Sequence, residues 1–323
     1  VGMVAGAVIS GAYVGDKLSP LSDTTNLAPA MAGGELFTHI RYMTYTTVPS
    51  IVITLLVFFI LSLTQETTGL ADTESLMLAI KEKFAINLWL FIVPTVVIVL
   101  IIKKTPPLVA LLIGTLLGGL FAFIFQPGIL MEITDSDSLT PATAYQGIMD
   151  AISVSTEITT SNVLLNDLFT SGGMEGMLGT IWLIICAMVF GGIMDAIGAL
   201  SRISNALLNW AQTTFQLFAS TVASCLAINL TASDQYLSIV IPGKMFANAY
   251  DERGLAPENL SRTLEDSGTV TSVLIPWNTC GAYQSGVLGV GVGDYFIYAI
   301  FNWISPFMTL LYAALRIKIA EKK

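Results

Sequence analysis

The sequence carries little charge: 11% of its 323 residues are Asp, Glu, Lys or Arg, whereas 54% are apolar. About a quarter of the residues of a soluble globular domain are charged. The composition therefore excludes a soluble domain and predicts an integral membrane protein in contact with a lipid bilayer. The formal net charge of −9 argues against nucleic acid as a partner, because nucleic acid binds basic surfaces.

Cysteine and histidine are also scarce. The three cysteines, Cys186, Cys225 and Cys280, lack the spacing of metal ligands, and an odd number in membrane segments indicates packing residues rather than disulfides. The single histidine, His39, lies at the expected membrane interface. The sequence has no phosphate loop and no nucleophile paired with a base, so we expect neither a cofactor nor an enzymatic activity.

Long uncharged runs predict where the chain crosses the membrane, since a crossing needs about 20 residues. The expected spans are Met43–Leu63, Phe84–Ile102, Pro106–Phe125, Leu178–Met194 and Phe296–Leu315. Residues 126–177 hold seven acidic residues and no Lys or Arg, which predicts an acidic extramembrane connector with interfacial helices near 142–152 and 162–169.

Basic residues predict the topology. By the positive-inside rule the acidic connector faces outside, and the C-terminus, with Arg316, Lys318 and Lys322, is expected in the cytoplasm. We expect a multi-pass protein of the plasma membrane.

Three polar islands interrupt the apolar chain. The first island, Gly15–Ala30, reads GDKLSPLSDTTNLAPA; the second, Asn229–Gln235, contains Asp234; the third, Glu265–Ala282, reads EDSGTVTSVLIPWNTCGA. Such segments are tolerated in a membrane only where they face protein or water, so they predict the functional site. We interpret the first and third islands as re-entrant hairpins that enter from opposite sides, and the second as the middle of a broken transmembrane helix.

The first and third islands share a pattern. Each has an acid, a Ser/Thr-rich run, a Pro and an Asn beside a Thr, and each is followed by a full span, which predicts inverted-topology repeats. We expect residues 1–125 to hold the first repeat with its following helix pair, 126–177 the connector and 178–323 the second repeat. The chain opens VGMVAGAVIS without an initiator Met, so we expect the first repeat to lack its leading helices.

At these islands the sequence resembles the NhaC family of sodium/proton antiporters, within the larger ion transporter superfamily. The matching stretches are GDKLSPLSDTTNLAPA with FTHIRYM after it, TASDQYLSIVIPGKMF, and GLAPENLSRTLEDSGTVTSVLIPWNTCGA. The resemblance covers essentially the whole chain. It implies a secondary active transporter with two inverted repeats that forms a homodimer and moves its substrate by an elevator-like displacement. Some members of the family resemble exchangers of malate for lactate coupled to sodium and protons.

Sodium prefers hard oxygen ligands, and the islands supply them. The candidate ion- or substrate-binding residues are Asp16, Ser22, Asp23, Thr24, Thr25, Asn26, Ser233, Asp234, Asp266, Thr271, Ser272, Asn278 and Thr279. The expected Na+ ligands are Asp23, Asn26, Asp234 and Asn278. A desolvated carboxylate holds either a proton or a sodium ion, which predicts Na+/H+ exchange at the midplane, with Asp234 as the leading carrier. The alternative for Ser22, Asp23 and Thr24 is helix N-capping.

Two other functions stay open. Sodium- and proton-coupled exchange of small carboxylates or amino acids would use Asn26, Asn278 and helix N-termini to bind the anion, although neither island contains an Arg. A more remote alternative is an ion channel or a membrane scaffold. A channel filter is usually built from repeated identical elements, whereas the two expected hairpins are similar but not alike.

Overall fold

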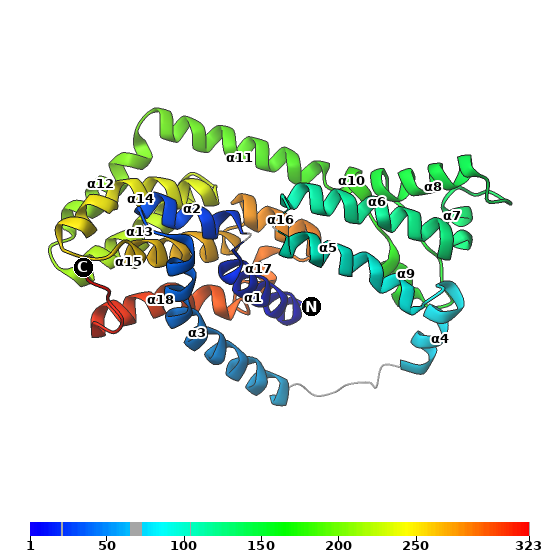
Figure 1. Ribbon diagram of the computed structural model, residues 1–323, viewed down its shortest axis with the longest axis horizontal. Helices are drawn as coiled ribbons and strands as arrows, with labels where there is room; N and C mark the ends of the chain where they lie inside the picture. The colour runs from blue at the N-terminus through cyan, green and yellow to red at the C-terminus, as the bar shows by residue number, and fades with distance from the viewer. Residues whose placement is uncertain (21, 65–72, 104, 323) are drawn as a thin grey trace. The chain divides into compact units, whose positions relative to one another are not determined.

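The computed structural model describes residues 1–20, 22–64, 73–103 and 105–322 (Figure 1). Within these ranges the chain forms helices and two isolated β-bridges but no named strand, so the expected all-α class is confirmed. Part of the connector expected after the first span, residues 65–72, and Lys104 of the expected turn lie outside the described residues. The chain divides into two compact units, Val1–Gln65 with Thr180–Lys323, and Glu66–Gly179.

Several helices have the length and composition of membrane spans. Among the described residues four qualify by themselves: α3 (Leu36–Thr64), Leu108–Phe125 of α6 (Pro107–Phe125), α11 (Leu178–Ala196) and α13 (Thr214–Thr231). The first three confirm, by length and composition, the helices that the apolar runs predict.

Two expected spans are shorter than the sequence suggests. The run Phe84–Ile102 is not one helix: η1 (Leu88–Phe91) and α5 (Ile92–Ile102) follow a bend of 84° from the preceding helix. The bend arises because Asn87 is extended and its side chain caps η1 by accepting a hydrogen bond from the Trp89 N–H at 3.0 Å. The last helix, α18 (Ile300–Leu315), begins four residues later than expected.

The unit Glu66–Gly179 consists of short helices around the α5–α6 pair. These are α4 (Thr73–Lys83), η1, α5, α6, α7 (Pro127–Ile133), α8 (Pro141–Ser153), α9 (Val163–Phe169) and α10 (Gly173–Gly176). Helices α8 and α9 confirm the helices expected in the acidic connector. A Thr140–Thr143 capping box starts α8, and an ion pair of 2.5 Å between Lys83 and Glu132 joins α4 to α7.

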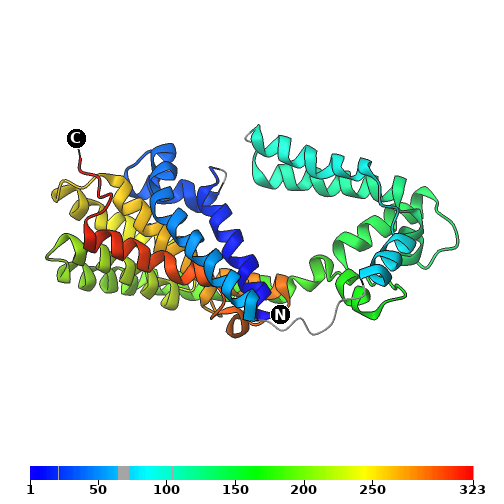
Figure 2. The ribbon, with the colours of Figure 1, turned by 90° about the horizontal axis from the view of Figure 1, so that it is seen from below.

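The other unit contains all three polar islands. Besides α3, α11 and α13 it holds α1 (Gly2–Leu18), α2 (Asp23–Ala32), α12 (Ala199–Trp210), α14 (Gln235–Glu252), α15 (Pro257–Leu264), a π-helical turn η2 (Glu265–Thr269), a 3-10 turn η3 (Ser272–Leu274), α16 (Thr279–Leu288), α17 (Val292–Tyr295) and α18. Helices α3 and α18 lie side by side (Figure 2). An apolar core that includes Phe218, Phe246 and Leu264 packs α13, α14 and α15 together.

Helices α13 and α14 form a hairpin. Thr221 on α13 and Tyr250 on α14 are hydrogen-bonded at 3.2 Å, although each lies far along its helix from the connecting residues. The expected broken transmembrane helix around Asp234 is therefore wrong. The chain reverses at the second island because Ser233 takes the left-handed conformation, with φ of 60°, and Asp234 is extended.

The first and third islands interrupt helices whose two arms do not pack along each other. In the first island α1 packs on α3, α17 and α18, whereas α2 packs on α14 and α15. In the third island α15 and η2 pack among α2, α13 and α14, whereas α16 contacts η3 and α17. In the first island both arms also contact α3, and α1 contacts α2 over a short stretch. The paired-arm hairpins expected at these two islands are therefore not confirmed.

A glycine lets α2 and α14 approach closely. A Cβ atom on Gly243 of α14 would lie 2.7 Å from the Cβ of Met31 on α2, a distance at which one helix would have to move. Only glycine fits this crossing without displacing backbone.

Candidate functional site

The tip of the α13–α14 hairpin, residues 232–234, packs against the third island, where the helix is interrupted before α16. The Thr279 N–H donates to the Ser233 carbonyl at 3.0 Å, and the Gln235 amide donates to the Thr269 carbonyl at 3.1 Å. Trp277 adds an indole hydrogen bond of 2.8 Å to the Leu230 carbonyl. The structure therefore brings the second and third islands together, as a site shared by both requires.

Two asparagines form the centre of this junction. Asn278 donates its amide to the Asn229 side-chain oxygen at 3.1 Å and to the Asn229 carbonyl at 3.2 Å. Asn229 in turn donates to the Gly268 carbonyl at 2.7 Å and to the Thr271 hydroxyl at 3.1 Å. All of these side chains are buried. Asn229 is absent from the expected site residues, although it begins the second polar island, and that position is the signal that identifies it.

Asp234 is buried and caps a helix. Its side chain accepts a hydrogen bond of 2.9 Å from the Leu237 N–H, which satisfies one of the free donors at the start of α14.

The first island folds onto itself and reaches the hairpin tip at one point. The Ser22 hydroxyl caps α2 by accepting from the Thr25 N–H at 3.3 Å, so the capping alternative holds for Ser22. The Thr24 hydroxyl donates to Asp16 at 3.4 Å. Asp23 is exposed and accepts a hydrogen bond from Tyr236, just beyond the tip.

The four expected sodium ligands divide into two pairs. Asp234 and Asn278 are buried and lie on the two segments joined at the hairpin tip. Asp23 and Asn26 are exposed, and the Asn26 amide donates to the Pro20 carbonyl at 2.9 Å and to the Ser22 carbonyl at 2.6 Å.

A buried ion pair links the first and third islands. Lys17 on α1 and Asp266 in η2 are fully buried and form a salt bridge. Ser305 on α18 lies 3.2 Å from both the Lys17 ammonium and the Asp266 carboxylate, and Thr309 also donates to Asp266. Asp16 is adjacent to Lys17 in the sequence, but the ion pair of Lys17 is with Asp266. The sequence feature that points to Lys17 is a single basic residue at the end of an apolar helix.

Glu265, beside this ion pair in the chain, is fully buried. Neither of its carboxyl oxygens has a hydrogen-bond partner among the described residues. The Thr269 hydroxyl, at the other end of the same π-helical turn, is likewise without a partner in that part of the chain. Such turns are frequent at functional sites.

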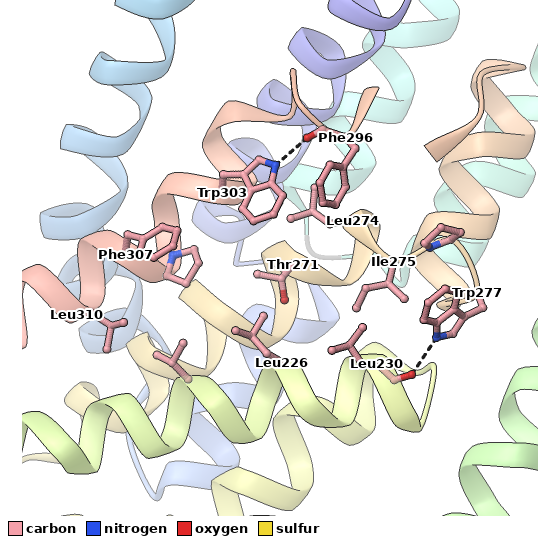
Figure 3. A pocket seen from close by; sticks show the side chains of 13 residues that line it. Leu226, Leu230, Thr271, Leu274, Ile275, Trp277, Phe296, Trp303, Phe307 and Leu310 are labelled. Carbon is pink, nitrogen blue, oxygen red and sulfur yellow. Dashed lines mark hydrogen bonds between the residues drawn. The ribbon is translucent and has the colours of Figure 1, made fainter. Parts of the chain in front are cut away.

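An apolar cavity of about 430 Å³ lies between α13, α18 and the break of the third island (Figure 3). Aromatic side chains such as Trp277, Trp303 and Phe307 line it. Both indole N–H groups donate to backbone carbonyls, and the Thr271 hydroxyl donates to the Ser267 carbonyl. The cavity therefore adjoins the polar junction but lacks the oxygen atoms that a cation needs.

The potential ligand atoms of the site suit a monovalent cation better than a transition metal. Among the described residues no group of three or more His, Cys, Asp or Glu side chains is placed to hold a metal ion. A cation here would rely on amide, hydroxyl and carbonyl oxygens with one carboxylate.

These features define a polytopic helical membrane protein whose hairpin tip is docked into a polar break beside a buried ion pair. The model of the Na+/H+ antiporter family matches residues 11–317, and the chain belongs to this family. The resemblance inferred from the islands is thereby confirmed.

Curated relatives agree with this assignment. The Na+/H+ antiporter NhaC of Alkalihalophilus pseudofirmus is 35% identical over 321 residues, which cover 99% of this chain and 66% of the relative. The Na+/H+ antiporter NhaC of Bacillus subtilis is 34% identical, over 95% of this chain and 65% of the relative. The malate-2H+/Na+-lactate antiporter of Bacillus subtilis is 35% identical, over 94% and 61%. The chain thus spans about two thirds of the length of these relatives. No solved structure matches the chain.

Proposed function

We propose that the protein is a secondary active transporter that exchanges Na+ for H+ at a buried carboxylate. The observation that carries this proposal is the Lys17–Asp266 ion pair, fully buried among the hydroxyls of Ser305 and Thr309. An unpaired charge in a buried site is costly, so an ionised Asp266 requires a cation beside it. Membership of the Na+/H+ antiporter family supports the same function.

In this mechanism Na+ and the Lys17 ammonium compete for Asp266. When Na+ binds the carboxylate, Lys17 loses its counter-charge in a buried site and releases its proton. When Lys17 takes up a proton again, the ammonium returns to Asp266 and Na+ leaves. The pair together with any bound Na+ has the same net charge in both states, so neither state leaves an uncompensated charge.

The hairpin tip and the two breaks supply the remaining oxygen ligands. We assign Asp234 and Asn278 to the sodium path on the hairpin side, and Asp23 and Asn26 to its opposite wall. The other candidates line this path: Asp16, Ser22, Thr24, Thr25, Ser233, Thr271, Ser272 and Thr279. Asp266 replaces Asp234 as the proposed carrier because Asp234 caps α14, whereas Asp266 holds a cation.

The same proposal includes inverted repeats with the site at the midplane. The re-entrant element of the second repeat is then the α13–α14 hairpin, because its two arms pack against each other. The first and third islands are the interrupted helices that occupy equivalent positions in the two repeats. We also propose that the protein forms a homodimer in the plasma membrane and that its C-terminus lies in the cytoplasm.

Proton flux driven by a sodium gradient tests the function in vesicles that contain the full-length protein. We expect wild type to exchange Na+ for H+ and Asp266→Asn to have no measurable exchange. Asp251→Asn is the matched control, because Asp251 forms an exposed ion pair of 2.5 Å with Lys322. Exchange that persists in Asp266→Asn would reject this carrier, whereas a wild type without sodium-dependent flux would reject the function.

Exchange of small carboxylates or amino acids is the second candidate. It is favoured by two relatives: the malate-2H+/Na+-lactate antiporter, and the arginine/ornithine antiporter ArcD of Halobacterium salinarum, which is 34% identical over 96% of this chain. Uptake of labelled malate, lactate and arginine by the same vesicles decides between the two.

A further inference from the structure

The segment after α18 is fixed in place across α3 and the start of α15. The Ala320 N–H donates to the Tyr42 hydroxyl at 2.9 Å, and the Ala320 carbonyl accepts from the Asn259 amide at 2.7 Å and from the Ala256 N–H at 2.9 Å. A β-bridge between Leu255 and Glu321 continues this pairing. The C-terminal side chains are therefore held in defined positions against α3.

This arrangement gathers basic side chains at one end of α3. Lys318 places its ammonium 4.9 Å from the centre of the Tyr45 ring, close enough for a cation–π contact. Arg41 lies one helical turn before Tyr45 and shares its face. Lys318 therefore contacts the ring of Tyr45, and Arg41 lies on the same face of α3 one turn away, although the two cations come from segments far apart in the sequence.

These cations have no acidic partner within the part of the chain that the structure describes. The ion pairs found there use Lys17, Lys83 and Lys322. Arg41 and Lys318 are exposed, although the chain has 23 acids for 14 basic residues. In a chain with excess acid, unpaired cations gathered at one place indicate an anion that comes from outside the chain.

The backbone that presents Lys318 is unusual as well. Arg316 and Lys318 have φ of 54° and 48°, in the left-handed region that residues other than glycine seldom adopt. Such conformations persist where surrounding contacts enforce them, and they cluster at ligand-binding sites.

An exposed apolar stripe continues from these cations along α3. Val48, Val52, Leu55 and Phe59 follow Tyr45 at intervals of three and four residues and are 51%, 48%, 61% and 63% exposed. From Val48 to Phe59 the helix rises about 16 Å, which is close to half of the roughly 30 Å hydrocarbon core of a bilayer. The stripe therefore has the length of one lipid leaflet.

We propose that Arg41, Tyr45 and Lys318 bind the phosphate headgroup of an anionic phospholipid whose acyl chain lies along Val48–Phe59. Basic residues just outside a span attract anionic headgroups, and the aromatic ring lies at headgroup level between them. The acyl chain covers apolar surface that no other described part of the chain covers. The site is separate from the proposed exchange site and does not depend on the exchange reaction.

Thermal unfolding of the full-length protein in detergent tests the proposal. We expect added phosphatidylglycerol to raise the unfolding midpoint by a few degrees, because a ligand that binds only the folded state stabilises it. We expect phosphatidylcholine and inorganic phosphate to have no such effect. The double variant Arg41→Gln/Lys318→Gln loses most of the rise, whereas Lys103→Gln/Arg202→Gln, which removes two exposed cations elsewhere, keeps it.

Three results would overturn the proposal. An equal rise in the Arg41→Gln/Lys318→Gln variant places the lipid elsewhere. An equal rise with phosphatidylcholine means that only the acyl chain is recognised, and an equal rise with inorganic phosphate means a free-anion site. If the double variant does not fold, native mass spectrometry of the wild type decides, since the proposal requires phosphatidylglycerol to stay bound where phosphatidylcholine at the same concentration does not.

Discussion

Asn278 donates its side-chain amide to both acceptor oxygens of Asn229, at 3.1 Å and 3.2 Å. This double contact holds the interrupted helix of the third island against the hairpin arm α13. Both side chains are fully buried, so the loss of the amide leaves two acceptors without water to replace it.

We expect Asn278→Ala to weaken sodium binding. Each buried acceptor left without a partner costs about 1–3 kcal/mol, and about 1.4 kcal/mol corresponds to a tenfold change in affinity. The sodium concentration for half-maximal exchange should therefore rise at least about tenfold. Asn248→Ala, which changes an exposed asparagine on α14, is the control. Equal effects of the two substitutions would contradict the role of the Asn229–Asn278 contact.

The burial of the Lys17–Asp266 ion pair predicts how substitutions of its two residues change the stability of the protein. Removal of one partner from a buried ion pair costs about 3–5 kcal/mol, whereas replacement of both by apolar residues is often neutral. We expect Lys17→Met to lower the unfolding midpoint strongly and Lys17→Met/Asp266→Leu to recover most of the loss. Neither variant should exchange ions. A double variant that is less stable than the sum of both single variants would argue against a direct pair.

Substitutions of Asp234 distinguish its role as a helix cap from a role of its negative charge in exchange. Asparagine caps a helix as well as aspartate does, whereas alanine costs about 1 kcal/mol. We expect Asp234→Asn to unfold at the wild-type temperature and Asp234→Ala to unfold earlier. In vesicles, Asp234→Asn should require more sodium yet retain exchange. Complete loss of exchange in a stable Asp234→Asn protein would return the carrier role to Asp234.

Cys280 reports on the hairpin tip. Its thiol lies 3.2 Å from the Gln235 side-chain oxygen, and Cys225 is buried, so in a Cys186→Ser background a maleimide should label Cys280 alone. We expect Na+ to slow this labelling several-fold relative to K+, because the bound ion holds the tip closed. Labelling rates that are equal in Na+ and K+ would mean that sodium does not engage the tip.

The spans and the polar islands could be predicted from the sequence because both depend on local composition. The apolar runs at α3, α6 and α11 fix those helices whatever their neighbours. The shape of each island could not be predicted, because a hairpin tip and an interrupted helix both read as polar residues with a Pro or Gly between apolar arms. Only contacts such as that of Thr221 with Tyr250 distinguish them, and these depend on packing between distant segments.

Among the candidate site residues, some were likewise predictable from the sequence and others were not. Asn278 and Thr271 were predicted from residue type, and both lie in the buried junction. The sequence does not predict the role of Lys17, because its partner is 249 positions away. The sequence predicts Asp234 as the leading carrier, whereas the contacts favour Asp266, and the exchange measurements decide between the two.

Gly243 constrains how this protein can move. Since a Cβ there would lie 2.7 Å from the Cβ of Met31, α14 and α2 are in close contact at this crossing. We expect α2 and α14 to move together, because separating them would break this contact. Any displacement that opens the site alternately to the two sides of the membrane has its joint outside this crossing.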